Sequence, residues 1–212
     1  MINPFVFKPL IPLNGLVSNW KFNEGSGSII TDSVSGSNGS ISGVPFWVAG
    51  KSNFAISSSG DSYIIVPTNS GNKTSVGSMS IWFKSTNTGQ FGYRGIFIKQ
   101  LAYGIFLIDG NLSWYDWGGT GAHSSSVSIL PEGWHHIVLT FSSGIANGTK
   151  LYCDGVLILT SQMTISSQVN PITIGCGTSV GGQPIIGNMD EAKLYNRILT
   201  QEEVLQLYHE FG

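Results

Sequence analysis

The sequence predicts an all-β protein, a two-sheet antiparallel jelly-roll sandwich with one short C-terminal helix. Short runs rich in β-branched and aromatic residues recur along the chain, separated by clusters of Gly, Ser, Asn and Asp. Two Asp-Gly pairs, Asp109-Gly110 and Asp154-Gly155, supply the positive φ angles of two-residue hairpin turns. The 212 residues are 41% hydrophobic, which is enough for a core, and a single β-sandwich can reach this length.

Each strand is predicted over an apolar run that is bounded by turn residues. The runs do not alternate with helical segments, and no long period repeats, so a parallel α/β fold, a solenoid and a propeller are all disfavoured. In chain order, we expect strands at 16–22, 62–66, 79–84, 94–100, 103–108, 112–117, 135–141, 150–153, 156–160, 172–174 and 189–195.

One helix is predicted at about residues 201–209. Thr200 and Glu203 have the spacing of a capping box, and Leu199 can pack on Val204 across the start of the helix. The apolar positions that follow recur at helical spacing, so this helix should pack on the sandwich with a structural role.

The first residues differ from the rest. Residues 1–14 are apolar and contain Pro4, Pro9 and Pro12, which favours an extended arm or an edge strand of the sandwich, with a disordered tail as the third alternative. An arm could dock on a neighbouring subunit of a homo-oligomer or on a protein assembly partner. Residues 15–212 are expected to form one jelly-roll domain.

Composition excludes several classes. Charged residues are only 10% of the chain and the net charge is −2, with no basic run, which argues against a nucleic-acid binder. No apolar stretch is long enough for a membrane-spanning helix. The N-terminus lacks the pattern of a signal peptide. Cys153 and Cys176 could form one disulfide or remain buried free thiols, and the sequence leaves both open.

Several motifs resemble one known family as a set. They are Trp20-Lys21-Phe22-Asn23-Glu24-Gly25, Gly133-Trp134-His135-His136, Leu151-Tyr152-Cys153-Asp154-Gly155, Asp190-Glu191 and Tyr195-Asn196-Arg197-Ile198-Leu199-Thr200. Over about residues 15–210 the chain resembles the laminin-G-like jelly-roll domains of the concanavalin A-like lectin/glucanase class. The resemblance implies two packed sheets of about six or seven strands each.

Some members of that wider class are glycoside hydrolases. Retaining hydrolysis needs two carboxyl groups about 5 Å apart, and the related enzymes carry Glu-x-Asp-x-x-Glu on one strand. Here Asp109, Asp116 and Asp154 are isolated, and the neighbours Asp190-Glu191 would point to opposite faces of a strand. No nucleophile motif is present either. We therefore expect a protein that is not an enzyme.

Carbohydrate binding needs flat aromatic faces and a few hydrogen-bonding side chains. The aromatic run 113–119 is the best candidate, and because alternate strand residues face opposite sides, one set could be core and the other exposed. Two further candidates lie in the Gly-rich segment 89–95, and one in a polar loop. The candidate glycan-binding residues are Trp114, Tyr115, Asp116, Trp117, Tyr93, Arg94 and His123.

Other aromatic and histidine residues are given structural roles. Trp20, Trp82 and Trp134 lie in strand motifs and are assigned to the core. His135 and His136 are expected to hydrogen-bond to the backbone, since no neighbouring ligand spacing indicates a metal site.

The resemblance also implies a structural calcium ion that joins the first strand to the last. Calcium prefers several oxygen ligands, and the implied ligands are Asn23, Asp32 and Asp190. No EF-hand spacing is present, so this expectation depends on the resemblance alone.

Two functions remain open from the sequence. The first is a non-catalytic carbohydrate-binding or adhesion module that recognises a glycan or a cell-surface polysaccharide. The alternative is a structural or decoration protein of a phage or viral particle, which uses the jelly roll for assembly. Either function predicts an extracellular or virion-associated location without a recognisable signal peptide.

Overall fold

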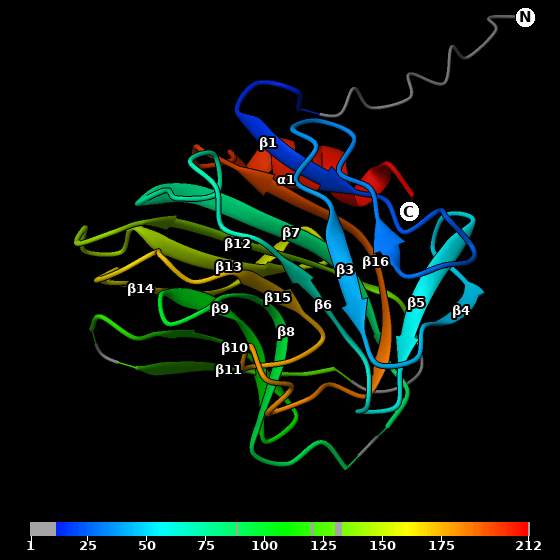
Figure 1. Cartoon of the computed structure of the whole chain (residues 1–212). Helices are drawn as coiled ribbons and strands as arrows, with labels where there is room; N and C mark the ends of the chain where they lie inside the picture. Colours follow the sequence, from blue (N-terminus) through cyan, green and yellow to red (C-terminus); the bar gives the residue numbers. More distant parts are fainter. Residues whose placement is uncertain (1–11, 88, 120, 130–132, 212) are drawn as a thin grey trace, which may run out of the picture.

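Two antiparallel β-sheets pack face to face in the computed structural model, which describes residues 12–87, 89–119, 121–129 and 133–211 (Figure 1). This confirms the predicted jelly-roll sandwich with one C-terminal helix. The arm expected at residues 1–14 lies outside the described residues except for 12–14. Among the described residues, no helix is long and apolar enough to cross a membrane.

Within the described residues, the first sheet has eight strands. β1 (Leu16–Trp20) pairs with β16 (Gly187–Tyr195), which also lies between β7 (Val76–Ser85) and β5 (Phe54–Ser58). The other strands follow in spatial order: β14 (Val156–Ser161), β13 (Thr149–Cys153), β12 (His135–Ser142), β7 (Val76–Ser85), β16 (Gly187–Tyr195), β5 (Phe54–Ser58) and β4 (Phe46–Ala49).

The second sheet also has eight strands in the described part of the chain, so each sheet exceeds the six or seven that were expected. Some strands were not predicted from the sequence: the short strands β2 (Ile29–Ile30), β3 (Gly39–Ser42), β4 and β5, and also β11 (Ala122–Ser128). The spatial order is β11 (Ala122–Ser128), β10 (Asn111–Asp116), β9 (Tyr103–Ile108), β8 (Tyr93–Lys99), β15 (Ile172–Ile174), β6 (Tyr63–Val66), β3 (Gly39–Ser42) and β2 (Ile29–Ile30).

Both predicted hairpins are present, and their turns have the expected backbone. Asp109 and Gly110 have φ angles of 50° and 79°, and they join β9 to β10. Asp154 and Gly155 have φ angles of 51° and 78°, and they join β13 to β14. Two positive φ angles in a row are the mark of a type I′ turn, whose twist matches that of the flanking strands.

The core lies between the sheets. Trp20 is fully buried there and meets Phe97 edge to face, with ring centroids 6.1 Å apart. Trp82 is buried as predicted, but it stacks on Tyr208 of the helix, on the outer face of the first sheet. The prediction for Trp134 was wrong: it is only half-buried. Trp134 precedes the first residue of β12, so strand pairing does not hold its side chain against the core.

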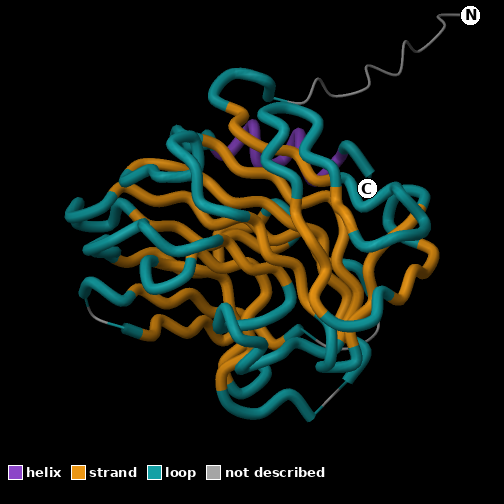
Figure 2. The backbone as a smooth tube through the Cα atoms, viewed as in Figure 1, coloured by secondary structure: helices purple, strands orange, loops and turns teal. Residues whose placement is uncertain are grey.

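The helix α1 (Gln201–His209) has the predicted bounds and covers the outer face of the first sheet (Figure 2). Thr200 and Glu203 form the capping box. Val204 and Leu207 are buried in a small cluster with Tyr195 of β16. Both cysteines are free and buried, which decides between the two alternatives left open by the sequence.

Candidate functional site

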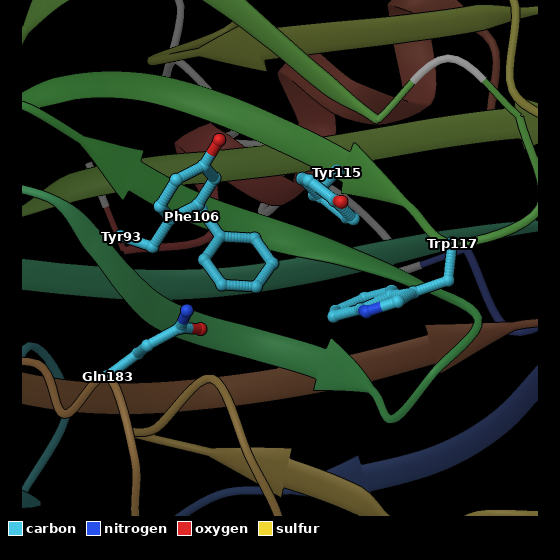
Figure 3. A pocket seen from close by; sticks show the side chains of 5 residues that line it. All are labelled: Tyr93, Phe106, Tyr115, Trp117 and Gln183. Atoms are coloured by element: carbon cyan, nitrogen blue, oxygen red, sulfur yellow. The ribbon is translucent and has the colours of Figure 1, made fainter.

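An aromatic pocket of about 230 Å³ lies on the outer face of the second sheet (Figure 3). Three strands and two loops contribute to it. We call it the aromatic pocket, and its lining residues are Tyr93 from β8, Phe106 from β9, Tyr115 from β10, Trp117 directly after β10, and Gln183 from the loop before β16.

Side-chain alternation along β9 and β10 explains why aromatic rings gather on this face. Leu112 and Trp114 of β10 lie in the core, so Tyr115 points the other way. In β9, Ile105 lies in the core and Phe106 beside it faces outward. Each strand therefore places one ring on the outer face of the sheet.

The four aromatic rings form the bottom and the sides of the pocket, and neighbouring rings are steeply inclined to one another. Phe106 is the floor and is only 1% exposed, although it faces away from the core. Tyr115 and Trp117 have ring centroids 4.7 Å apart at 62°, and Tyr93 meets Tyr115 at 5.8 Å and 82°. Tyr93 is 38% exposed at the rim. The arrangement offers ring faces and phenol hydroxyls to a ligand of modest size.

A buried carboxylate holds the loop that carries Trp117. One oxygen of Asp116 accepts hydrogen bonds from the backbone N–H groups of Gly119 and Gly121, at 3.2 and 3.0 Å. The other oxygen accepts from Thr164 N at 2.7 Å, which ties this loop to the segment after β14. Gly118 packs so closely there that a Cβ atom would lie 2.5 Å from Thr164 O. Asp116 is therefore a positioning residue for the pocket.

The opposite edge of the pocket is formed by Gln183. Its backbone carbonyl accepts hydrogen bonds from Gly95 N at 2.9 Å and Gly177 N at 3.1 Å, which seats its loop on β8. A Cβ atom on Gly95 would lie 2.3 Å from Gly177 N, so only glycine permits this approach. A second hollow of about 210 Å³ shares Trp117 and Gln183 with the aromatic pocket. The two hollows therefore adjoin.

The structure separates the seven predicted glycan-binding residues. Tyr93, Tyr115 and Trp117 line the pocket. Trp114 and Asp116 were predicted wrongly as contact residues, because both are buried, at 0% and 1% exposure. Trp114 and Asp116 are buried because they lie on the same inward-facing side of β10 as Leu112.

His123 and Arg94 also lie apart from the pocket lining. His123 is in β11 rather than in a loop, and its ring stacks on buried Trp114 with centroids 4.0 Å apart. Its Nδ1 is hydrogen-bonded to Ser161 Oγ of β14, and burial lowers its pKa although Asp116 acts in the opposite direction. Arg94 follows Tyr93 in β8, so its side chain leaves the opposite face of the strand.

Phe106 and Gln183 also line the pocket but were not predicted from the sequence. Phe106 lies in a run that is apolar at every position, Ile105 to Ile108, so no alternation showed which residues face outward. Gln183 lies in a Gly-rich loop, and only the folded chain brings that loop to the edge of the pocket. No local pattern could have identified it.

The residues expected to bind calcium have other partners. Asp32 accepts hydrogen bonds from Asn19 N, Val34 N, Ser35 Oγ and Ser37 N. Asp190 is fully buried, and burial raises its pKa to about 7. The oxygens of Asp190 accept from Ser52 N and Glu191 N, while Asn23 Oδ1 accepts from Phe54 N. Calcium at these residues stays a prediction.

The two adjacent histidines bind side chains rather than the backbone, so that prediction was wrong. His136 Nε2 lies 2.9 Å from Ser80 Oγ, and burial lowers the pKa of this ring to about 3. His135 Nδ1 lies 2.7 Å from Asp154 Oδ2. Asp154 is the first residue of the β13–β14 turn, so the fold brings it to the start of β12.

Two antiparallel sheets packed face to face define a jelly-roll sandwich. The chain belongs to the concanavalin A-like lectin/glucanases superfamily, since the Laminin_G_3 family model matches residues 58–205. No curated protein matches the chain in sequence. The recognised family and fold agree with the resemblance noted in the sequence.

Solved structures share the fold at low sequence identity. Domain 4 of AbnA, a GH43 extracellular arabinanase from Geobacillus stearothermophilus in complex with arabinotriose, is 22% identical with a TM-score of 0.70, over 91% of this chain and 98% of that one. The binding domain of Paraclostridial Mosquitocidal Protein 1 is 21% identical, with a TM-score of 0.73 over 92% of this chain. Trypanosoma rangeli sialidase in complex with sialic acid is 17% identical, with a TM-score of 0.69 over 93% of this chain.

The extent of the match differs among these structures. The chain spans nearly all of the arabinanase domain, about half (52%) of the mosquitocidal binding domain and a third (33%) of the sialidase chain. Proteins that contain this fold thus include both binding domains and enzymes. At these sequence identities, the similarity to the three structures is limited to the fold.

Proposed function

We propose that this protein is a non-catalytic module that binds a neutral glycan in the aromatic pocket. The observation that carries the proposal is the outward-facing set of aromatic rings. The ring centroids of Tyr115 and Trp117 are 4.7 Å apart, and the buried ring of Phe106 forms the bottom of the pocket. Aromatic faces exposed in a concave site with a few polar groups are typical of ligand recognition. An aromatic cluster of this kind on the outside of a sheet adds nothing to the core.

The lining supports an uncharged ligand. In the described part of the chain, the aromatic pocket and the second hollow are lined by aromatic, amide, hydroxyl and aliphatic residues without a Lys, Arg, Asp or Glu. An acidic sugar would bring a carboxylate that requires a cationic partner, usually Arg. A neutral sugar needs only ring faces and neutral hydrogen-bonding groups such as Gln183.

The same lining supports binding without catalysis. Glycoside hydrolysis in most families uses two carboxyl groups on either side of the scissile bond. The nearest carboxylate to Trp117 in sequence, Asp116, is buried and accepts backbone hydrogen bonds from Gly119, Gly121 and Thr164. It holds the loop rather than facing a ligand. The arabinanase domain in complex with arabinotriose gives a first ligand to try.

Titration calorimetry with arabinotriose and with neutral hexose oligomers tests the proposal. Trp117→Ala removes one wall, and truncating an aromatic anchor typically costs about 2 kcal/mol. The dissociation constant should then rise roughly 30-fold. Phe46→Ala is the matched control, because Phe46 is an exposed aromatic residue in a different hollow, on β4. Equal binding by both variants, or no binding by the wild type to any neutral oligomer, would refute the proposal.

A further inference from the structure

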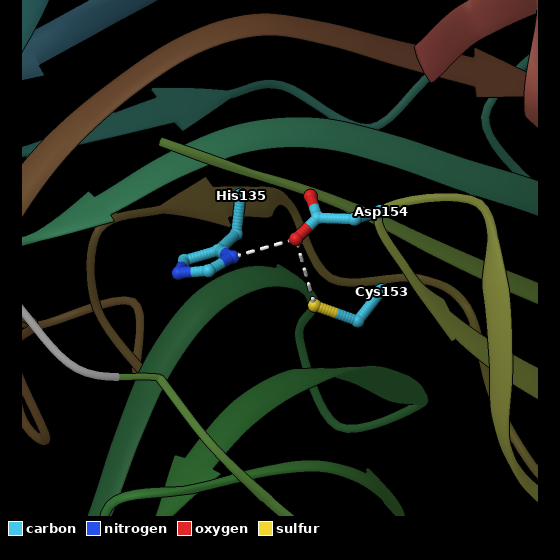
Figure 4. A group of neighbouring side chains, drawn as sticks. All are labelled: His135, Cys153 and Asp154. Atoms are coloured by element: carbon cyan, nitrogen blue, oxygen red, sulfur yellow. Dashed lines mark hydrogen bonds and ion pairs between the residues drawn. The ribbon is translucent and has the colours of Figure 1, made fainter. Parts of the chain in front are cut away.

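A cluster of three different metal-ligating side chains lies on the first sheet (Figure 4). His135 opens β12, Cys153 ends β13, and Asp154 begins the turn that follows. Their ligand atoms all lie within 4.8 Å of one another. Among the described residues, no other group of three His, Cys, Asp or Glu side chains meets that criterion. The cluster has no part in the aromatic pocket.

The backbone fixes these three residues together. Ile137 pairs with Cys153 in the register of β12 and β13, which brings the start of one strand to the end of the other. Asp154 N donates to His136 O at 2.8 Å, and His136 N donates to Asp154 Oδ1 at 2.8 Å. The other carboxylate oxygen, Oδ2, lies 2.7 Å from His135 Nδ1 and 3.8 Å from Cys153 Sγ.

These distances suit a small tetrahedral cation. Zinc binds thiolate sulfur at about 2.3 Å, and imidazole nitrogen or carboxylate oxygen at about 2.0–2.2 Å. Donor atoms around such an ion lie roughly 3.3–3.8 Å apart, as follows from those bond lengths and tetrahedral angles. The 3.8 Å separation of Sγ and Oδ2 already falls there. The 2.7 Å separation of Nδ1 and Oδ2 must open by roughly 0.6 Å. The separation of Nδ1 and Sγ, which is within 4.8 Å, must close by at most about 1.2 Å.

The cluster stands where the core meets solvent. Cys153 is 7% exposed and belongs to the core, whereas the side chains of His135 and Asp154 are 29% and 31% exposed. An ion can therefore enter from the solvent side and retain water as a fourth ligand. The thiolate and carboxylate together carry the charge that neutralises a divalent cation. Calcium and magnesium prefer all-oxygen sites, so sulfur and nitrogen donors favour zinc.

We propose that His135, Cys153 and Asp154 form a binding site for a zinc-class divalent transition metal. On binding, the Cys153 thiol releases its proton to solvent and ligates as thiolate. Asp154 ligates as carboxylate, and His135 ligates through Nδ1 as a neutral ring with its proton on Nε2. Burial and the neighbouring carboxylate of Asp154 raise the pKa of the free thiol to about 12, so the metal must displace a proton.

Cobalt(II) titration of the untagged, reduced full chain tests the site, because cobalt substitutes for zinc and a cobalt–thiolate bond gives a charge-transfer band in the near ultraviolet. The wild type should develop this band, and added zinc should remove it. Cys153→Ala should abolish it. The matched control is Cys176→Ala, which removes the other buried thiol and should leave the band unchanged.

Asp154→Asn tests the third ligand without destroying the turn, since Asn-Gly is also favoured in type I′ turns. Losing a ligand should weaken cobalt binding at least about tenfold, the lower limit seen when only outer-shell partners are lost. Zinc should also raise the Tm of the wild type and not that of Cys153→Ala. The proposal is overturned if the wild type gives no thiolate band, or if the band survives Cys153→Ala or disappears in Cys176→Ala.

Discussion

The buried carboxylate of Asp116 gives a strict test of how the pocket is built. Asp116→Asn keeps one oxygen, which can still accept from Gly119 N and Gly121 N. The amide nitrogen then faces Thr164 N, which loses its acceptor at 2.7 Å. A hydrogen bond to a charged group contributes about 1.5–3 kcal/mol, so we expect a loss of about 2 kcal/mol in the free energy of unfolding.

Thermal and urea unfolding measure this change. For a chain of this size, 2 kcal/mol corresponds to a decrease in Tm of roughly 4–8 °C. Asp109→Asn is the control, because Asp109 lies in an exposed type I′ turn where Asn-Gly is equally suitable, and we expect less than about 0.5 kcal/mol. Because Asp116 holds the loop of Trp117, its variant should also bind neutral glycans more weakly. Full glycan affinity in a destabilised Asp116→Asn variant would refute its role in the pocket.

Three further predictions concern stability. The pKa of Asp190 is raised to about 7, so between pH 4 and 7 the folded chain holds a proton that the unfolded chain has lost. The contribution of this group to the free energy of unfolding therefore falls by up to about 4 kcal/mol as pH rises from 4 to 7. In urea unfolding, Asp190→Asn should therefore become more stable relative to the wild type as pH rises over that range. A difference in unfolding free energy that does not change with pH would contradict the prediction. Thr200→Ala should cost about 1 kcal/mol through loss of the helix cap, measured in the same way. If Asn23, Asp32 and Asp190 bind calcium, excess Ca²⁺ should raise the Tm above its value in EDTA. Equal Tm values would refute the calcium site, and these side chains would then serve only as hydrogen-bond partners.

Features encoded by neighbouring residues were predictable from the sequence. The capping box of Thr200 and Glu203 gave the helix its correct bounds. The Asp-Gly pairs identified two hairpins, because few residues other than glycine, asparagine and aspartate adopt two consecutive positive φ angles. Strand pairs of only two to five residues, such as β2 with β3 and β4 with β5, carry too few residues for a periodic signal.

The zinc-class cluster illustrates what sequence patterns leave out. His135 and Asp154 are 19 residues apart, and their contact depends on the pairing of β12 with β13. The spacing matches no metal motif, because the ligands come from the end of one strand, the start of another and a turn. Pairing the predicted strands 135–141 and 150–153 as antiparallel neighbours would have brought the three residues together.

The register of β10 determines which aromatic residues can bind a ligand. A shift of one residue would bring Tyr115 into the core and Trp114 to the outer face, because side chains alternate along a strand. The Asp109-Gly110 turn prevents this shift by pairing Asn111 with Ile108 and Tyr115 with Gly104. The direction of the alternation could be read from the residues after the turn, since Leu112 is apolar and Ser113 polar, and Leu112 belongs in the core. From that assignment, Trp114 follows inward and Tyr115 outward, and with them the binding face that we propose.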